Sequence, residues 1–190
     1  MFAAVTSVAL VGVEPKPVRV EVHVGGSTPS FSLVGLPDTA VREAKERVRS
    51  AVASSGFAFP NRRLTVNLAP ADLPKVGSAY DLPIALGILA AGGLVPSAAA
   101  EVVALGELAL DGAVRSAREG IGAALVARDR AVRCLLPIDA ASEASAVGGD
   151  VHAVRSLAHA VATALGEEGA EVGREEPSPS PTWVELADVR

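Results

Sequence analysis

A cluster of basic side chains between residues 42 and 63 is the first feature of the sequence that could do chemistry. Its members are Arg42, Lys45, Arg47, Arg49, Arg62 and Arg63. Arg42, Lys45 and Arg49 are three to four residues apart, so on a helix they share one side. One interpretation is a solvated helix face, with ion pairs between residues 42 and 46 and between residues 43 and 47. The other is a surface that contacts nucleic-acid phosphates.

A proline-rich segment from Asn67 to Ser78 is the second candidate. It reads NLAPADLPKVGS and lies between an alternating strand pattern and an apolar helix pattern. Such a segment is either a rigid connector or a binding or catalytic loop, and the residues alone leave both open. Its cation, Lys75, joins the residues that could contact a phosphate.

Complete catalytic motifs are missing from the sequence. No glycine precedes a lysine, so there is no Walker A loop, and Gly120-Ile121-Gly122 lies within a helical pattern without a third glycine. No nucleophile elbow is present. Cys134, the one cysteine, reads as a core residue, and the three histidines are scattered, with no metal-ligand spacing. His23 is expected to face solvent. The sequence therefore predicts no catalytic, cofactor-binding or metal-binding residue.

The elements that position the basic cluster can be read from hydrophobic spacing. Asp38 is an N-cap candidate for a helix that ends near Gly56, and apolar residues between 41 and 52 form its buried side. Arg62 and Arg63 begin a strand over residues 64–68. They point to opposite faces of that strand, so only one of them can join the helix cluster.

The remaining pattern predicts an α/β fold, or more loosely α+β, with helices packed on a mixed sheet. Further strands are expected at 5–13, 18–24, 31–34, 102–110, 132–136 and 151–154, with Glu14 to Pro17 as a connection and Asp111-Gly112 as a hairpin turn. Further helices are expected at 81–91, 117–128, 140–147 and 156–165.

Composition and charge divide the chain in two. Hydrophobic residues make up 49% and charged residues 21% of the 190, which is typical of a globular protein. Residues 1–165 carry 15 basic and 15 acidic side chains, whereas residues 166–190 carry two basic and seven acidic side chains. Residues 166–181 read as a flexible acidic linker and 182–190 as the start of a further module. No signal peptide or membrane span is expected, so we expect a cytoplasmic protein.

Five motifs resemble a known family. They are VGLPD (34–38), REAKERVRSA (42–51), VNLAPADLPK (66–75), YDLPIA (80–85) and GELALDG (106–112). Together they resemble the N-terminal domain of ComM (YifB-type) proteins, which are magnesium-chelatase-like AAA+ ATPases, over residues 3–165. The resemblance implies a ribosomal S5 domain 2-like fold, shared with the proteolytic domain of Lon.

The resemblance also implies a function. The family's ATPase works as a hexameric ring in DNA branch migration during natural transformation, with ATP and magnesium in a module that would follow residue 182. The domain itself is expected to be non-catalytic and to organise the ring or to bind DNA weakly, without a membrane. The DNA-binding residues expected are Arg42, Lys45, Arg49, Arg62, Arg63 and Lys75.

The likeness to Lon raises one alternative, a serine peptidase. Lon's serine falls on Ala79, with Ser78 one residue earlier, and its lysine falls near Arg115. Arginine is a poor general base because it does not lose its proton, so we expect no peptidase activity. A second alternative is an interaction module of a magnesium-chelatase-type metallation complex.

Overall fold

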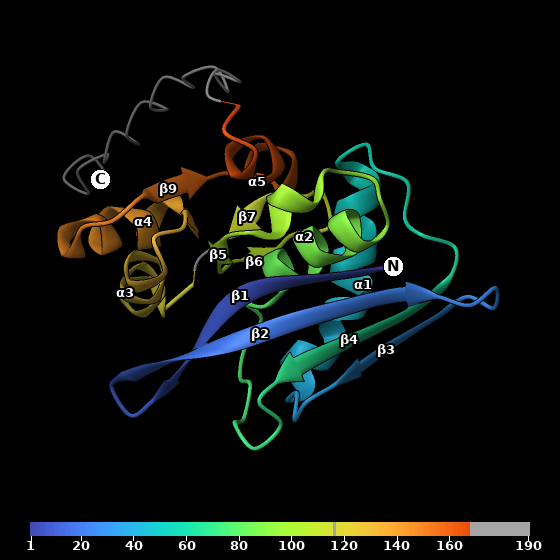
Figure 1. Ribbon diagram of the computed structural model, residues 1–190, viewed down its shortest axis with the longest axis horizontal. Helices are drawn as coiled ribbons and strands as arrows, with labels where there is room; N and C mark the ends of the chain where they lie inside the picture. Colours follow the sequence, from blue (N-terminus) through green and yellow to red (C-terminus); the bar gives the residue numbers. More distant parts are fainter. Residues whose placement is uncertain (116, 168–190) are drawn as a thin grey trace, which may run out of the picture.

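The computed structural model describes residues 1–115 and 117–167, and their main sheet has seven strands (Figure 1). The strands are β1 (Phe2–Val11), β2 (Glu14–Gly25), β3 (Ser30–Val34), β4 (Arg63–Ala69), β5 (Val103–Ala104), β6 (Glu107–Leu108), β7 (Val114–Arg115), β8 (Cys134–Pro137) and β9 (Val151–Val154). The helices are α1 (Thr39–Ser54), α2 (Asp81–Ala91), α3 (Gly120–Arg130), α4 (Ile138–Ala144) and α5 (Leu157–Ala164), with 3-10 turns η1 (Ser97–Ala100) and η2 (Ser145–Val147).

The sheet is mixed, which confirms the α/β class. Its strand order is β3-β4-β2-β1-β5-β8-β9. The pairs β1–β2 and β2–β4 are antiparallel, and the other neighbours are parallel. Strands β6 and β7 form a separate hairpin across the predicted Asp111-Gly112 turn. The likeness to the S5 and Lon folds stays a prediction.

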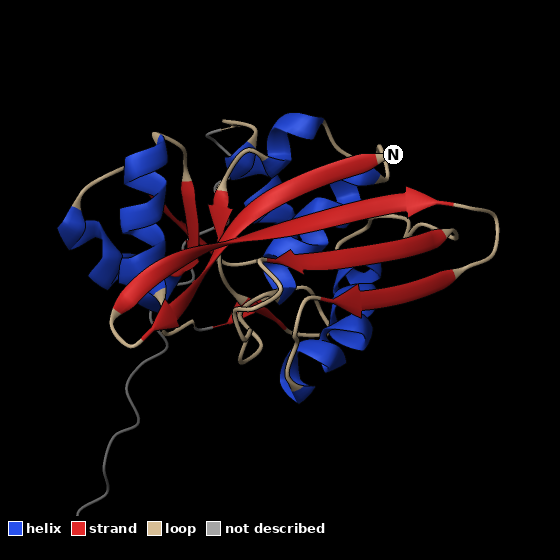
Figure 2. Cartoon of the chain, turned by 60° about the horizontal axis from the view of Figure 1, so that its bottom comes forward, coloured by secondary structure: helices blue, strands red, loops and turns tan. Residues whose placement is uncertain are grey.

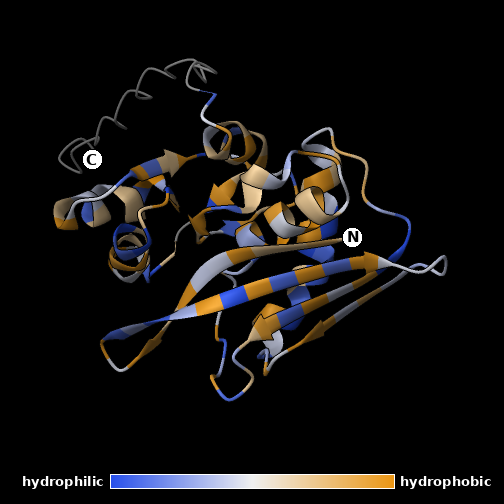
Figure 3. Ribbon diagram, viewed as in Figure 1, coloured by the Kyte–Doolittle hydropathy of each residue, from blue (hydrophilic) through white to orange (hydrophobic). Residues whose placement is uncertain are grey.

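Helices cover the two faces of the sheet unequally. α1, α2 and α5 share the larger core with inward-facing side chains of β1 to β4, whereas α3 and α4 form a second core with β5 and β8. Along β2, Val18, Val20 and Val22 are fully buried and the residues between them are not. Figure 3 shows the matching alternation of hydrophobic and hydrophilic residues along this strand. Gly87 lets α2 approach closely, because a Cβ there would lie 2.7 Å from Cγ2 of Val22.

α3 and α4 pack over β5 and β8, and α3 also covers the ends of β1 and β2 around Val8 and Pro15. Within the described residues, no helix covers the same face of β3 and β4 or the rest of β1 and β2. Figure 2 looks onto these strands, with helices behind them. We call this surface, made by the outward-facing residues of β1 to β4, the open face.

Two sequence expectations need correction. Glu14 to Pro17 is not a connection but the start of β2, and Gly12-Val13 makes the turn between Val11 and Glu14. Pro15 and Pro17 are tolerated because β4 pairs with β2 only from Arg19 onwards, so that edge of β2 needs no donor there. The expected strand at 102–110 is divided, since β5 joins the main sheet and β6 joins the hairpin.

Within the part of the chain that the structure describes, no helix is both long and apolar enough to span a membrane. Of the predicted linker, residues 166 and 167 are described. The rest of the linker and the predicted module start at 182–190 lie outside the described residues.

Candidate functional site

Helix α1 presents the predicted basic row to solvent. Asp38 caps the helix, because its carboxylate accepts a hydrogen bond of 2.8 Å from the Val41 backbone N–H. The buried side consists of Val41, Ala44, Val48, Ala51 and Val52. Arg42 and Arg49 are therefore exposed and Lys45 is half-buried. The Arg49 guanidinium lies 4.6 Å from the centre of the Phe59 ring, which holds this cation at the surface.

The other three predicted residues do not extend this row. Arg62 donates a hydrogen bond of 3.3 Å from Nε to the carbonyl oxygen of Gly26, at the β2–β3 turn. Arg63 alternates with Leu64, whose side chain is buried on the helix side, so Arg63 lies on the open face. Arg62 precedes the first residue of β4, so its expected place on the opposite face of the strand stays a prediction.

Lys75 must be removed from the predicted phosphate-binding set. Its side chain is fully buried, and its ammonium group donates a hydrogen bond to the carbonyl oxygen of Pro70. Burial lowers the pKa of Lys75, and the charge of Asp72 opposes this effect. An ammonium enclosed in this way cannot reach a phosphate on the surface. Nothing in the local sequence distinguishes it from an exposed lysine.

The loop that holds Lys75 is tied to the start of α1, which favours the rigid-connector interpretation. The Asp38 carboxylate accepts a second hydrogen bond, 3.0 Å long, from the Gly77 backbone N–H. The backbone of Lys75 donates to the Leu36 carbonyl oxygen and accepts from the Asp38 N–H, at 3.3 and 3.1 Å. One carboxylate therefore fixes both the helix cap and the loop.

A buried ion pair lies on the inner side of α1. Arg47 donates two hydrogen bonds to Asp81, from Nε at 2.6 Å and from Nη2 at 3.0 Å, and Leu108 N–H donates a third at 3.2 Å. Burial raises the pKa of Asp81, while these donors oppose that effect; the hydrogen bond raises the pKa of Arg47. The hydrogen-bond partners of Asp81 among the described residues are all donors, which favours the ionised form of its carboxylate. The predicted pairing of residues 43 and 47 is also present, at 3.8 Å.

Ser78 and Arg115, the two positions that the likeness to Lon singled out, are both neighbours of Glu107, Ser78 through its side chain and Arg115 through strand pairing. The Ser78 hydroxyl donates a hydrogen bond to Glu107, and Glu107 is opposite Arg115 in the β6–β7 hairpin. Arg47, Glu107 and Arg115 line a shallow groove of about 560 Å³. A carboxylate is a weak base toward a serine hydroxyl, since its ordinary pKa is about 4.3. Ser78 therefore has a weak base as its side-chain hydrogen-bond partner.

No three His, Cys, Asp or Glu side chains gather as a metal site within residues 1–115 and 117–167. Sequence reasoning missed two other exposed cations, Arg19 and Arg130, which come together beside β1. Strand alternation placed Arg19 outward, but its neighbour from α3 could not be foreseen. His23 is exposed, as predicted, and Cys134 is buried.

Comparison with known proteins identifies the family to which the chain is similar. The chain matches the family described as subunit ChlI of Mg-chelatase over residues 20–140. It is 45% identical over 149 residues to the protein YifB of Salmonella typhimurium, which covers 78% of this chain and 29% of the relative. It is 46% identical over 147 residues to competence protein ComM of Haemophilus influenzae, at 77% and 29% coverage. The chain thus spans less than a third of the length of these curated relatives.

Proposed function

Because the chain belongs to the family of magnesium-chelatase-like ComM and YifB proteins, we propose that it is the non-catalytic N-terminal domain of a ComM-like AAA+ ATPase. In this proposal ATP and magnesium bind in a module outside these 190 residues. The domain contacts DNA during branch migration, and a ring of six subunits presents several copies of it. Weak single contacts then add up through effective concentration.

The observation that carries the DNA contact is the unpaired basic row of α1. Within the described residues, Arg42, Lys45 and Arg49 have no carboxylate within 4.0 Å, and the expected partner of Arg42 at position 46 is not used. Glu43 pairs instead with Arg47 on the inner side. Three cations on one helix side without acidic partners favour phosphate contact over the solvated-face interpretation.

Fluorescence anisotropy with forked DNA at low salt tests the proposal. The triple variant Arg42→Ala/Lys45→Ala/Arg49→Ala should bind more weakly than wild type. The slope of log affinity against log salt concentration should also become shallower by up to about 2.7, because each lost phosphate contact removes about 0.9. Its matched control is Arg115→Ala/Arg118→Ala/Arg155→Ala, which removes the same charge from exposed positions elsewhere. Equal affinities of the two variants would refute the contact and leave ring organisation as the role.

The peptidase alternative is not favoured by the site. Ser78 donates to Glu107, and the position that resembles Lon's lysine holds Arg115, so neither neighbour can take up the hydroxyl proton efficiently. The magnesium-chelatase match supports the second alternative, docking within a metallation complex, only through the family name.

A further inference from the structure

The open face has the side chains of a nucleic-acid surface, although the sequence directed attention to α1. On β1, Ala3 and Val5 are buried among the helices, so Phe2, Ala4 and Thr6 face the other way. The pairing register places Phe2 beside His23 and Thr6 beside Arg19. One stripe along β1 and β2 therefore begins with two aromatic rings and ends with a guanidinium.

The charges on the open face are predominantly positive. Arg19 and Arg63 come from the strands, and Glu21 is the carboxylate between them. Glu21 is already occupied: one oxygen lies 3.1 Å from Nε of Arg19, and the other accepts a hydrogen bond of 2.9 Å from Asn67. The Arg19 side chain remains 61% exposed, which leaves its outer nitrogens available for an anion.

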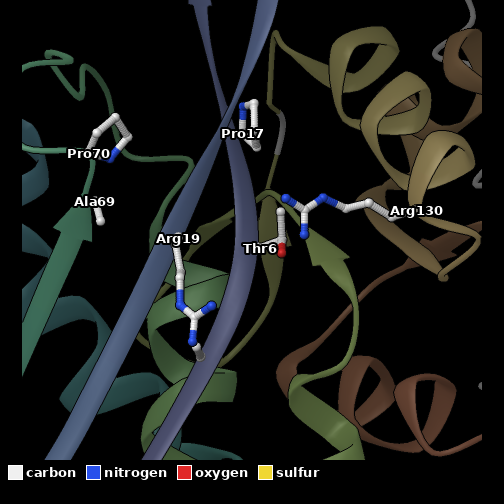
Figure 4. Close-up of a pocket in the computed structure, with 7 residues that line it drawn as sticks. Thr6, Pro17, Arg19, Ala69, Pro70 and Arg130 are labelled. Atoms are coloured by element: carbon white, nitrogen blue, oxygen red, sulfur yellow. The ribbon is translucent and has the colours of Figure 1, made fainter.

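Two adjoining hollows make a groove at the guanidinium end of the stripe. They measure about 340 and 310 Å³ and share Ala4, Thr6 and Arg130. Arg19 and Arg130 stand on either side of Thr6 above a floor of small side chains (Figure 4). Arg130 has no carboxylate partner among the described residues. Glu101 lines only the second hollow, so the first is the more favourable place for a phosphate.

The opposite end of the stripe offers a ring rather than a charge. Phe2 is 58% exposed and lies along β1 about 7 Å from Ala4, two residues on, and about 13 Å from Thr6, four residues on. An exposed aromatic ring beside a basic groove is the combination that binds single strands, since unpaired bases stack on the ring and phosphates meet the cations. In a duplex the base faces are covered by their neighbours and cannot stack on Phe2.

We infer that the open face binds a single strand of nucleic acid, with a backbone phosphate between Arg19 and Arg130 and a base stacked on Phe2. This inference rests on the proposed DNA role but uses a surface on the other side of the sheet from α1. Because the contacts are to phosphates and to a base face, binding should be independent of sequence and sensitive to salt.

Anisotropy of the 190-residue chain with labelled oligo(dT), and with a strand of the same length that lacks bases, tests the inference. Arg19→Ala/Arg130→Ala should weaken binding to both strands. Phe2→Leu should weaken oligo(dT) binding about fivefold or more and leave the base-free strand unaffected, because only stacking is lost. The control Arg118→Ala/Arg155→Ala removes the same charge outside the hollows and should bind as wild type.

The outcomes separate this inference from the proposed function. If the α1 triple variant loses oligo(dT) binding while the open-face variants retain it, the inference fails and the α1 contact stands. If Phe2→Leu weakens both strands equally, or if the control loses as much as Arg19→Ala/Arg130→Ala, the inference also fails. No measurable binding of oligo(dT) by the wild type would overturn it and leave the open face to a protein partner.

Discussion

The two faces of β1 to β4 are built from alternate residues of the same strands, yet they have opposite roles. On the covered face Val20, Val22 and Leu68 are fully buried beneath helices. On the open face Arg19 and His23 are exposed one residue away. Because strand side chains alternate, a substitution at one position leaves the other face intact. Stability and surface chemistry can therefore be separated by mutation.

Helix α1 repeats this division within one element. Arg47 turns inward and holds the buried Asp81, whereas Arg42 turns outward and has no acidic partner among the described residues. From residue type alone, Arg42 and Arg47 would be predicted to have the same role. What differs is the neighbour supplied from the start of α2.

The largest expected effect comes from removing the inward arginine. Arg47→Met leaves the Asp81 carboxylate buried without its cation, which should lower the free energy of unfolding by about 3–5 kcal/mol. Arg42→Met, on the outer side of the same helix, should change it by less than about 0.5 kcal/mol. Urea denaturation measures both. Similar losses for the two variants would show that the two sides of α1 do not differ as the contacts indicate.

A pair of residues on β4 tests the sheet in the same way. Leu68→Ala removes a fully buried side chain from the covered face and should cost about 2–5 kcal/mol. Thr65→Ala acts on the open face of the same strand and should cost less than about 0.5 kcal/mol. Both values come from denaturant titrations. A large loss for Thr65→Ala would mean that the open face is covered in solution.

Much of this arrangement could be predicted because it is encoded in local patterns. The alternation from Val18 to Val24, the Asp38 cap and the apolar stretch of α2 each specify an element by nearby residues. The prolines at 15 and 17 led to the wrong prediction of a connection. A proline breaks a strand only where the neighbouring strand needs a backbone N–H from that position. That depends on where β4 begins to pair.

The site was harder to predict because its contacts are distant in the sequence. Lys75 looks like a surface cation until the loop packs beside Leu36 and Asp38, about forty residues earlier. Arg130 lies two residues beyond the helix expected at 117–128, and only the packing of α3 beside β1 brings it to Arg19. Charge and spacing identify possible ligands, but tertiary contacts decide which are free.

The buried lysine should give the alkaline pH dependence a recognisable sign. Burial lowers the pKa of Lys75 below 10.5 in the folded protein, so between that lowered value and 10.5 the unfolded chain holds the extra proton. Stability contributed by this group therefore rises with pH across the window, by at most about 1.4 kcal/mol per pH unit, and is flat above 10.5.

The measurement is the difference in unfolding free energy between wild type and Lys75→Met, followed from neutral pH to about pH 11. The difference should grow in favour of wild type as pH rises. Burial raises the pKa of Cys134 to about 12 and opposes this trend, but it does so equally in both proteins and cancels. A constant difference for Lys75→Met would mean that its ammonium group is solvated.

The smallest expected effect concerns the acidic end of the chain, which can act on either basic surface. Removing residues 168–190 takes away six acidic and two basic side chains and changes the formal net charge from −5 to −1. DNA affinity at low salt should rise by no more than about tenfold, and the gain should vanish near 1 M salt, where charges are screened within about 3 Å. The 190-residue chain with Glu168, Glu171, Glu175 and Glu176 changed to Gln should give part of the same gain, because it differs from wild type in charge and not in length. Repeating the truncation in the two binding variants then locates the competition. A gain lost in Arg42→Ala/Lys45→Ala/Arg49→Ala assigns it to α1, and a gain lost in Arg19→Ala/Arg130→Ala assigns it to the open face. Equal affinities with and without residues 168–190 at low salt would show that the acidic end competes at neither surface.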